Sequence, residues 1–169
     1  VGDSVNETYN VTSVDGTPST VQITINGTND AATVSSDSQT YSETDAPITS
    51  SGTLTSPDPD DADNAFTPVN TIGTIGTFDI NATGAWTFTA NSAFDNLNVG
   101  DSVSETFNVT SLDGTPGTVT ITITGTEDAP IITGTSSGAV AEDGVLSANG
   151  TLTTSDADAA DTPTFTVQT

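Results

Sequence analysis

Apolar and polar residues alternate along this chain over short stretches, with the period of two that a half-buried β-strand requires. Residues 21–25 read VQITI, residues 119–123 read VTITI, and residues 107–110 read FNVT. Thr, Val, Ile and Phe all favour strands, and Thr on an outer face solvates a sheet without adding charge. No stretch carries the periodicity of an amphipathic helix. The pattern therefore predicts an all-β protein.

Turn signals separate these stretches at short intervals. FDI at 78–80 and WTF at 86–88 flank Asn81-Ala82-Thr83-Gly84, a hairpin loop whose glycine can adopt a positive φ. Asp113-Gly114 and Asp15-Gly16 mark a second kind of strand-to-strand turn. Short strands at this spacing, some seven in about 98 residues, indicate an immunoglobulin-like β-sandwich.

An internal repeat defines the organisation of the chain. Residues 1–30 and 99–128 lie 98 positions apart and are identical at 23 of 30 positions. Residues 52–67 and 150–166 match at nearly the same offset. We therefore expect tandem modules of about 98 residues. Residues 1–30 form the C-terminal part of one module, 31–128 a complete module, and 129–169 the N-terminal part of the next.

The charge of the chain restricts its partners. The sequence has 23 acidic residues and no Lys, Arg or His, which gives a formal net charge of −23. Such a charge opposes compaction unless cations neutralise it. Nucleic acids and anionic membrane surfaces are excluded as direct partners, because no side chain can neutralise a phosphate. Disorder is the competing interpretation of high charge with few aromatic residues, but the regular apolar pattern favours a folded chain.

The composition also limits how the fold can be reinforced. There is no Cys, so neither a disulfide nor a thiolate site can form. Small modules without disulfides usually need another stabilising element, and a bound metal is the common alternative. No stretch approaches the ~20 apolar residues of a membrane helix. The absence of Met indicates a piece of a longer polypeptide, which we expect to be secreted.

Clustered aspartates are the strongest local signal for chemistry. Asp58, Asp60, Asp61 and Asp63 lie within six residues. The pattern recurs in the next repeat with Asp156, Asp158 and Asp161. Carboxylates held together repel one another unless a metal intervenes, and Ca²⁺ prefers six to eight oxygen ligands. A solvated acidic loop is the alternative. The repetition of the pattern and the lack of basic residues favour a Ca²⁺ site.

The chain resembles a known family over its whole length. The stretch GTFDINATGAWTFTANSAFDNLNVGDSVSETFNVTSLDGTPGTVTITITGTEDAP is similar to the VCBS repeat of very large bacterial surface proteins. The order of its acidic residues also resembles that of a cadherin repeat. An acidic residue follows the first strand (Glu43, Glu142), an Asp-x-Asp loop comes next, a strand ends in Asp-Gly, and the module closes with Asn29-Asp30 or Glu127-Asp128.

The cadherin resemblance implies Ca²⁺ at the junctions between modules. It assigns to the first junction Asn29, Asp30, Asp58, Asp60 and Asp113, and to the second Glu43, Asp128, Asp156 and Asp158. Asp63 and Asp161, in the same two loops, complete the candidate ligands. Asp113 has an alternative role, because Asp-Gly is a good turn by itself.

Enzymatic activity is not expected. Paired carboxylates suggest glycoside hydrolysis, but no His is present for acid–base catalysis and no Lys or Arg to orient a substrate. A carbohydrate-binding module would need an exposed aromatic platform, for which Tyr41 is the candidate.

These observations predict a calcium-stiffened extender in a secreted bacterial surface adhesin, outside the cell, that supports adhesion or biofilm formation. Its partners would be neighbouring modules of the same longer chain. The alternative is a segment of an extracellular fibre or surface layer, with self-association. The junctions between modules would be flexible without Ca²⁺ and rigid with it.

Overall fold

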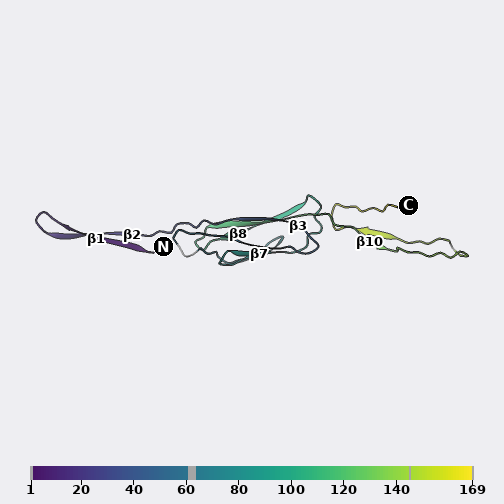
Figure 1. Cartoon of the computed structure of the whole chain (residues 1–169), viewed down its shortest axis with the longest axis horizontal. Coiled ribbons are helices and arrows are strands. Elements are labelled where there is room, and N and C mark those ends of the chain that lie inside the picture. The colour runs from purple at the N-terminus through teal and green to yellow at the C-terminus, as the bar shows by residue number, and fades with distance from the viewer. Residues whose placement is uncertain (1, 61–63, 145, 169) are drawn as a thin grey trace.

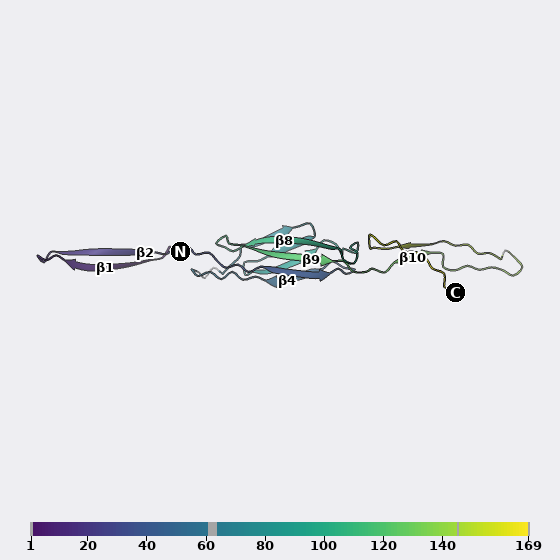
Figure 2. The same ribbon diagram turned by 90° about the horizontal axis from the view of Figure 1, so that it is seen from above.

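The computed structural model describes residues 2–60, 64–144 and 146–168, and the part it describes is built from strands. The chain is extended (Figures 1 and 2), with a β-hairpin at one end, a two-sheet sandwich in the middle and two short strands at the other end. These described residues contain no helix with the length and apolar character needed to cross a membrane.

The central sandwich consists of two sheets. The first has the strand order β3 (Asp37–Ser42), β9 (Pro116–Thr124) and β8 (Ser102–Thr110). The second has the order β4 (Thr49–Thr53), β7 (Ala85–Ala90), β6 (Gly76–Ile80) and β5 (Val69–Ile72). Strand β3 runs parallel to β9, and the remaining neighbours are antiparallel. The predicted all-β sandwich is confirmed.

The core lies between the two sheets, where the alternating strands place their apolar residues. Phe78 of β6 stacks on Phe107 of β8 with ring centroids 4.8 Å apart, which joins the two layers. Trp86 of β7 is 1% exposed and stacks on Phe78. On β9 the apolar positions predicted from VTITI are 0% exposed: Val119, Ile121 and Ile123. Such aromatic and aliphatic burial is the main stabilising term of a sandwich.

The turn between β6 and β7 has the predicted form. Gly84 adopts φ +80°, and a Cβ there would lie 2.3 Å from the carbonyl oxygen of Leu54. The Asn81 side-chain oxygen accepts hydrogen bonds from the backbone N–H groups of Thr83 and Ala85. A residue with a side chain would be strained at position 84 and would also collide with the neighbouring strand.

A carboxylate on β8 joins the two sheets by polar contacts. The two oxygens of Glu105 accept hydrogen bonds from the backbone N–H groups of Thr74 and Ile75, each at 3.0 Å, in the turn between β5 and β6. Burial raises the pKa of Glu105, but these hydrogen bonds outweigh it, so the pKa lies below its usual value. The charged form of Glu105 therefore stabilises the sandwich.

The segments on either side of the sandwich contain two strands each. Strands β1 (Ser4–Thr12) and β2 (Pro18–Asn26) pair antiparallel along their full length. Strands β10 (Ile131–Gly134) and β11 (Leu152–Ser155) pair over four residues. Both sheets of the sandwich are formed by strands between residues 37 and 124. The module boundaries at 30/31 and 128/129 stay a prediction.

We predict that Glu105→Gln destabilises the sandwich by about 1–3 kcal/mol, because Gln offers one oxygen where two backbone N–H groups need an acceptor. Denaturant unfolding followed by the fluorescence of buried Trp86 measures the effect. The matched control is Glu7→Gln, which makes the same charge change at the repeat position on exposed β1. Equal shifts of the Trp86 transition in both variants would mean that the effect is only that of net charge.

Candidate metal centre

Acidic side chains gather at the end of the sandwich where residues 125–129 lead into the C-terminal segment. The loop after β3, the loop between β7 and β8, and the loop after β11 all reach this junction. A pocket is lined there by carboxylates from both sides of residue 128 and by four uncharged residues: Asp45, Asp95, Glu127, Asp128, Ala129, Ile131, Ser155, Asp156 and Ala157. Residues far apart in the sequence thus form one acidic site.

One group of possible ligands belongs to the sandwich itself. Glu43, Asp95 and Asp128 each present a carboxylate oxygen, and these oxygens lie within 4.8 Å of one another. Two ligands on opposite sides of a Ca²⁺ ion are separated by about twice the 2.3–2.6 Å bond length. The spacing of the three oxygens is therefore compatible with a shared ion.

Each of these three carboxylates has a buried oxygen without a hydrogen-bond partner among the described residues: Glu43 Oε2, Asp95 Oδ1 and Asp128 Oδ2. Glu43 is only 2% exposed, and its other oxygen accepts a hydrogen bond from the backbone N–H of Thr126 at 2.9 Å. A buried carboxylate oxygen without a partner carries a large desolvation cost. A cation is the partner that would remove that cost for all three at once.

A second group connects the two sides of the junction. Glu127, Asp158 and Asp161 again present oxygens within 4.8 Å of one another. Asp158 is 3% exposed; its Oδ2 accepts the backbone N–H of Asp128 at 2.9 Å, whereas Oδ1 is buried and has no partner among the described residues. One carboxylate thus both anchors the linker and presents an oxygen for a ligand.

A further polar contact holds the two sides of the junction together without a metal. The side-chain oxygen of Asn98 accepts a hydrogen bond from the backbone N–H of Ala160 at 2.7 Å. The side-chain amide of Asn98 donates to Asp101 at 2.7 Å, which fixes its orientation. The loop between β7 and β8 therefore contacts the loop after β11 directly.

The electrostatics of the junction reflect this crowding of like charges. Burial, followed by repulsion from Glu43, raises the pKa of Asp128. Repulsion from Asp161 is the main cause that raises the pKa of Glu127. Since the sequence has no cationic side chain, only a proton or a bound cation can relieve the repulsion.

The first predicted junction repeats part of this arrangement 98 residues earlier. The backbone N–H of Asp30 donates to Asp60, and the N–H of Asp60 donates to Asp58 at 2.9 Å. At the second junction, the backbone N–H of Asp128 donates to Asp158, and the N–H of Asp158 donates to Asp156. Asn29 is exposed, and its side-chain amide donates to the carbonyl of Asp30.

No group of three carboxylates with converging oxygens forms at the first junction within the described residues. The repeat counterparts of Glu43 and Asp95 would fall before residue 1 of this sequence. Asp63, also predicted as a ligand, lies outside the described residues. Among the described residues, it is at the second junction that several predicted ligands come together.

Asp113 acts as a turn residue and as an anchor for the start of the sandwich. Its carboxylate accepts hydrogen bonds from the Ser111 hydroxyl, from the backbone N–H of Thr115 at 3.1 Å and from the backbone N–H of Ala32 at 2.8 Å. The Ser111 bond, followed by the Ala32 bond, lowers the pKa of Asp113 well below its usual value. Both oxygens have protein donors, as the turn interpretation requires.

Sequence reasoning missed two members of the centre, Asp95 and Glu127. Asp95 has no repeat counterpart within the chain, so the repeat comparison could not single it out. Its loop is marked in the structure by Phe94, which adopts φ +70°. Glu127 precedes Asp128, but its counterpart in the previous repeat is Asn29. Because no carboxylate recurs at this position, the repeat comparison did not mark Glu127 as a ligand.

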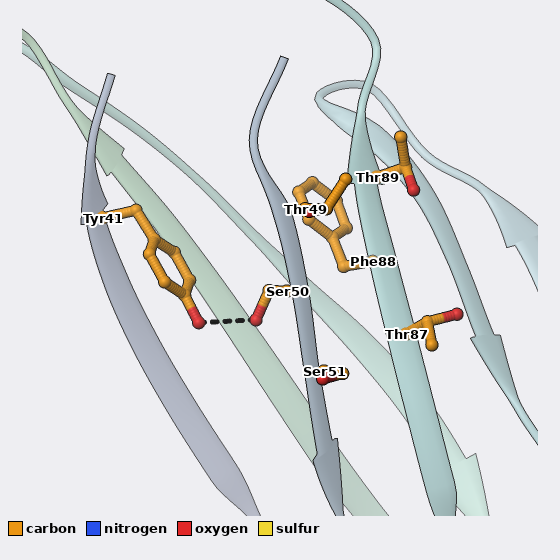
Figure 3. Close-up of a pocket in the computed structure, with 7 residues that line it drawn as sticks. All are labelled: Tyr41, Thr49, Ser50, Ser51, Thr87, Phe88 and Thr89. Atoms are coloured by element: carbon orange, nitrogen blue, oxygen red, sulfur yellow. Dashed lines mark hydrogen bonds between the residues drawn. The ribbon is translucent and has the colours of Figure 1, made fainter. Parts of the chain in front are cut away.

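Tyr41 is the candidate aromatic platform that a carbohydrate-binding module would need, and the structure shows its surroundings. Figure 3 shows Tyr41 of β3 turned toward β4, where its hydroxyl hydrogen-bonds that of Ser50 at 2.5 Å. The ring is partly buried against the core, beside a pocket lined mainly by small polar residues: Thr49, Ser50, Ser51, Thr87, Phe88 and Thr89. Tyr41 thus links the two sheets, and its partly buried ring is not the broad exposed platform that a carbohydrate-binding module would need.

Comparison with known families supports a cadherin-like module. The bacterial cadherin-like domain family matches residues 29–125, which is more than half of the chain. The match spans both sheets of the sandwich and, of the second-junction ligands, Glu43 and Asp95. A search of curated proteins found no match.

We predict that Asp113→Asn destabilises the sandwich at pH 7 and that its difference in stability from the parent protein becomes smaller between pH 4 and pH 3. Because the pKa of Asp113 is lowered on folding, the stability it contributes is present above the ordinary Asp value and is lost as the pH falls below about 4. Asp15→Asn is the matched control, since Asp15 occupies the equivalent turn on the exposed hairpin. Thermal unfolding from pH 7 to pH 3 measures the difference, and a constant difference across that range would contradict the assignment.

Proposed function

Because the chain belongs to the family of bacterial cadherin-like domains, which occur in surface proteins and generally bind Ca²⁺, we propose that it is a calcium-stiffened extender segment of a secreted bacterial surface adhesin. Domains of this type are structural and adhesive rather than typically enzymatic. The observation that carries the proposal is the set of buried carboxylate oxygens, on both sides of residue 128, that have no hydrogen-bond partner among the described residues.

The carboxylates at the second junction would hold cations in two separate groups. Glu43, Asp95 and Asp128 would hold an ion against the end of the sandwich, and Glu127, Asp158 and Asp161 would hold one across the linker. Asp158 is the element that joins the two sides, because it also accepts the backbone N–H of Asp128. The bound cation would supply the positive charge that the sequence lacks.

The mechanical consequence follows from this charge balance. Without cations, like charges would repel across the linker, opposed by the hydrogen bonds at Asp158 and Asn98. With cations, attraction replaces repulsion and the orientation of successive modules is fixed. Extracellular Ca²⁺ modules bind at about 10⁻⁴–10⁻³ M, so a junction of this class would stiffen outside the cell and support adhesion or biofilm formation there.

We predict that Ca²⁺ raises the stability of the sandwich by about 1.4 kcal/mol per bound ion when free Ca²⁺ is ten times Kd. Thermal unfolding and calorimetric titration in Ca²⁺, in chelator and in NaCl of equal ionic strength measure this effect. Glu43→Gln should abolish the part of the gain that comes from the ion shared with Asp95 and Asp128, because it removes a ligand that is almost completely buried.

Asp79→Asn is the matched control for charge, since Asp79 is exposed on β6, outside both ligand groups. It should retain the full response to Ca²⁺. A response in NaCl as large as that in Ca²⁺, or an equal loss in the Glu43 and Asp79 variants, would mean that the carboxylates are only screened and that no specific site exists.

A further inference from the structure

The hairpin of β1 and β2 presents an uncovered apolar face. Val5 pairs with Ile25 and Tyr9 with Val21, so their side chains share one side of the hairpin. Every described residue from 2 to 31 is exposed. The apolar side chains on that face have exposed fractions between 44% and 68%: Val5, Tyr9, Val11, Val21, Ile23 and Ile25. A contiguous apolar face of this kind marks an interaction surface.

The same face is the core of the sandwich one repeat later. Strands β8 and β9 pair in the register of β1 and β2 shifted by 98 residues, with Val103 opposite Ile123 as Val5 is opposite Ile25. There the corresponding side chains are nearly or completely buried against β6 and β7: Phe107, Val109, Val119, Ile121 and Ile123. The hairpin thus presents the apolar face that, in the central module, packs against the sheet containing β6 and β7.

A single carboxylate on the hairpin face defines what must lie against it. Glu7 pairs with Ile23 and points to the apolar side. Its counterpart Glu105 accepts two consecutive backbone N–H groups from the turn between β5 and β6. A carboxylate placed against a partner's apolar surface needs such donors, since leaving it without them is costly. The occupant must therefore present a tight turn with two free N–H groups to Glu7.

The edge of the hairpin gives a further requirement. Strand β9 pairs on one side with β8 and on the other with β3, which runs parallel to it over six residues. In the part of the chain that the structure describes, β2 pairs with β1 alone. The outer edge of β2 can therefore accept a parallel strand, as β9 does.

We propose that the β1–β2 hairpin docks the four-stranded sheet of a further repeat of this kind. The sheet equivalent to β4–β7–β6–β5 covers the apolar face, its turn donates two backbone N–H groups to Glu7, and a strand equivalent to β3 adds to the edge of β2. A second hairpin is disfavoured as the occupant, because two Glu7 carboxylates would meet in one apolar interface without donors. The chain's own four-stranded sheet is already covered by β8 and β9.

The test fuses a second copy of residues 31–98 directly before Val1, which reproduces at that point the junction between Asn98 and Val99. Amide hydrogen exchange is then compared in the parent and the extended chain. We expect exchange within residues 4–12 and 18–26 to slow by about 100-fold or more, because the hairpin joins a cooperative unit. The protection of β8 and β9 in the same molecule reports that the chain is folded.

Two aspartate substitutions on adjacent β2 positions make the test specific. In the extended chain, Ile23→Asp on the apolar face should abolish the new protection, whereas Thr24→Asp on the polar face should retain it. Unchanged exchange in the hairpin while β8 and β9 stay protected would overturn the proposal. So would a parent chain that dimerises in sedimentation and protects its hairpin without the added sheet, since the occupant would then be a second copy.

Discussion

Each carboxylate of this chain that is withdrawn from water must find its partner among hydroxyl groups, amide N–H groups and cations from the solvent, because the sequence contains no Lys, Arg or His. This constraint separates the acidic residues into two kinds. Glu105 and Asp113 have backbone donors for both oxygens, and their pKa values are lowered. At the second junction, four carboxylates each have a buried oxygen that no donor among the described residues satisfies: Glu43, Asp95, Asp128 and Asp158.

The two kinds of carboxylate also differ in what they do for the architecture. Those satisfied by N–H groups join segments within the sandwich: Glu105 ties β8 to the turn between β5 and β6, and Asp113 ties the β8–β9 turn to Ala32. Those left unsatisfied lie where one module meets the next. Internal stability thus rests on apolar packing and backbone donors. Under the proposed function, ions would hold the junction, and the ionic environment would change the stiffness of the chain without unfolding its modules.

Much of the fold could be predicted from the sequence because its signals are local and repeated. Alternation placed β2, β8 and β9, and the Asn81–Gly84 loop placed the β6–β7 hairpin. The candidate site was only partly predictable. Asp128, Asp158 and Asp161 stood out in repeated acidic motifs, and Glu43 by its order after the first strand. Asp95 reaches the site through a loop whose geometry no periodic pattern encodes. The role of Asp113 was ambiguous, because an Asp-Gly turn and a ligand look alike until the donors around them are known.

The most direct test of the account measures how far the junction moves with and without Ca²⁺. The absence of native Cys allows spin labels to be placed only at introduced cysteines, at exposed Thr87 on β7 and exposed Thr153 on β11. The distance distribution between the labels, measured by pulsed electron resonance, should be broad in chelator and collapse to one narrow peak in Ca²⁺. It should stay broad in NaCl of equal ionic strength. Equal widths in chelator and in Ca²⁺ would contradict the account, because the buried carboxylates would then not set the orientation of the modules.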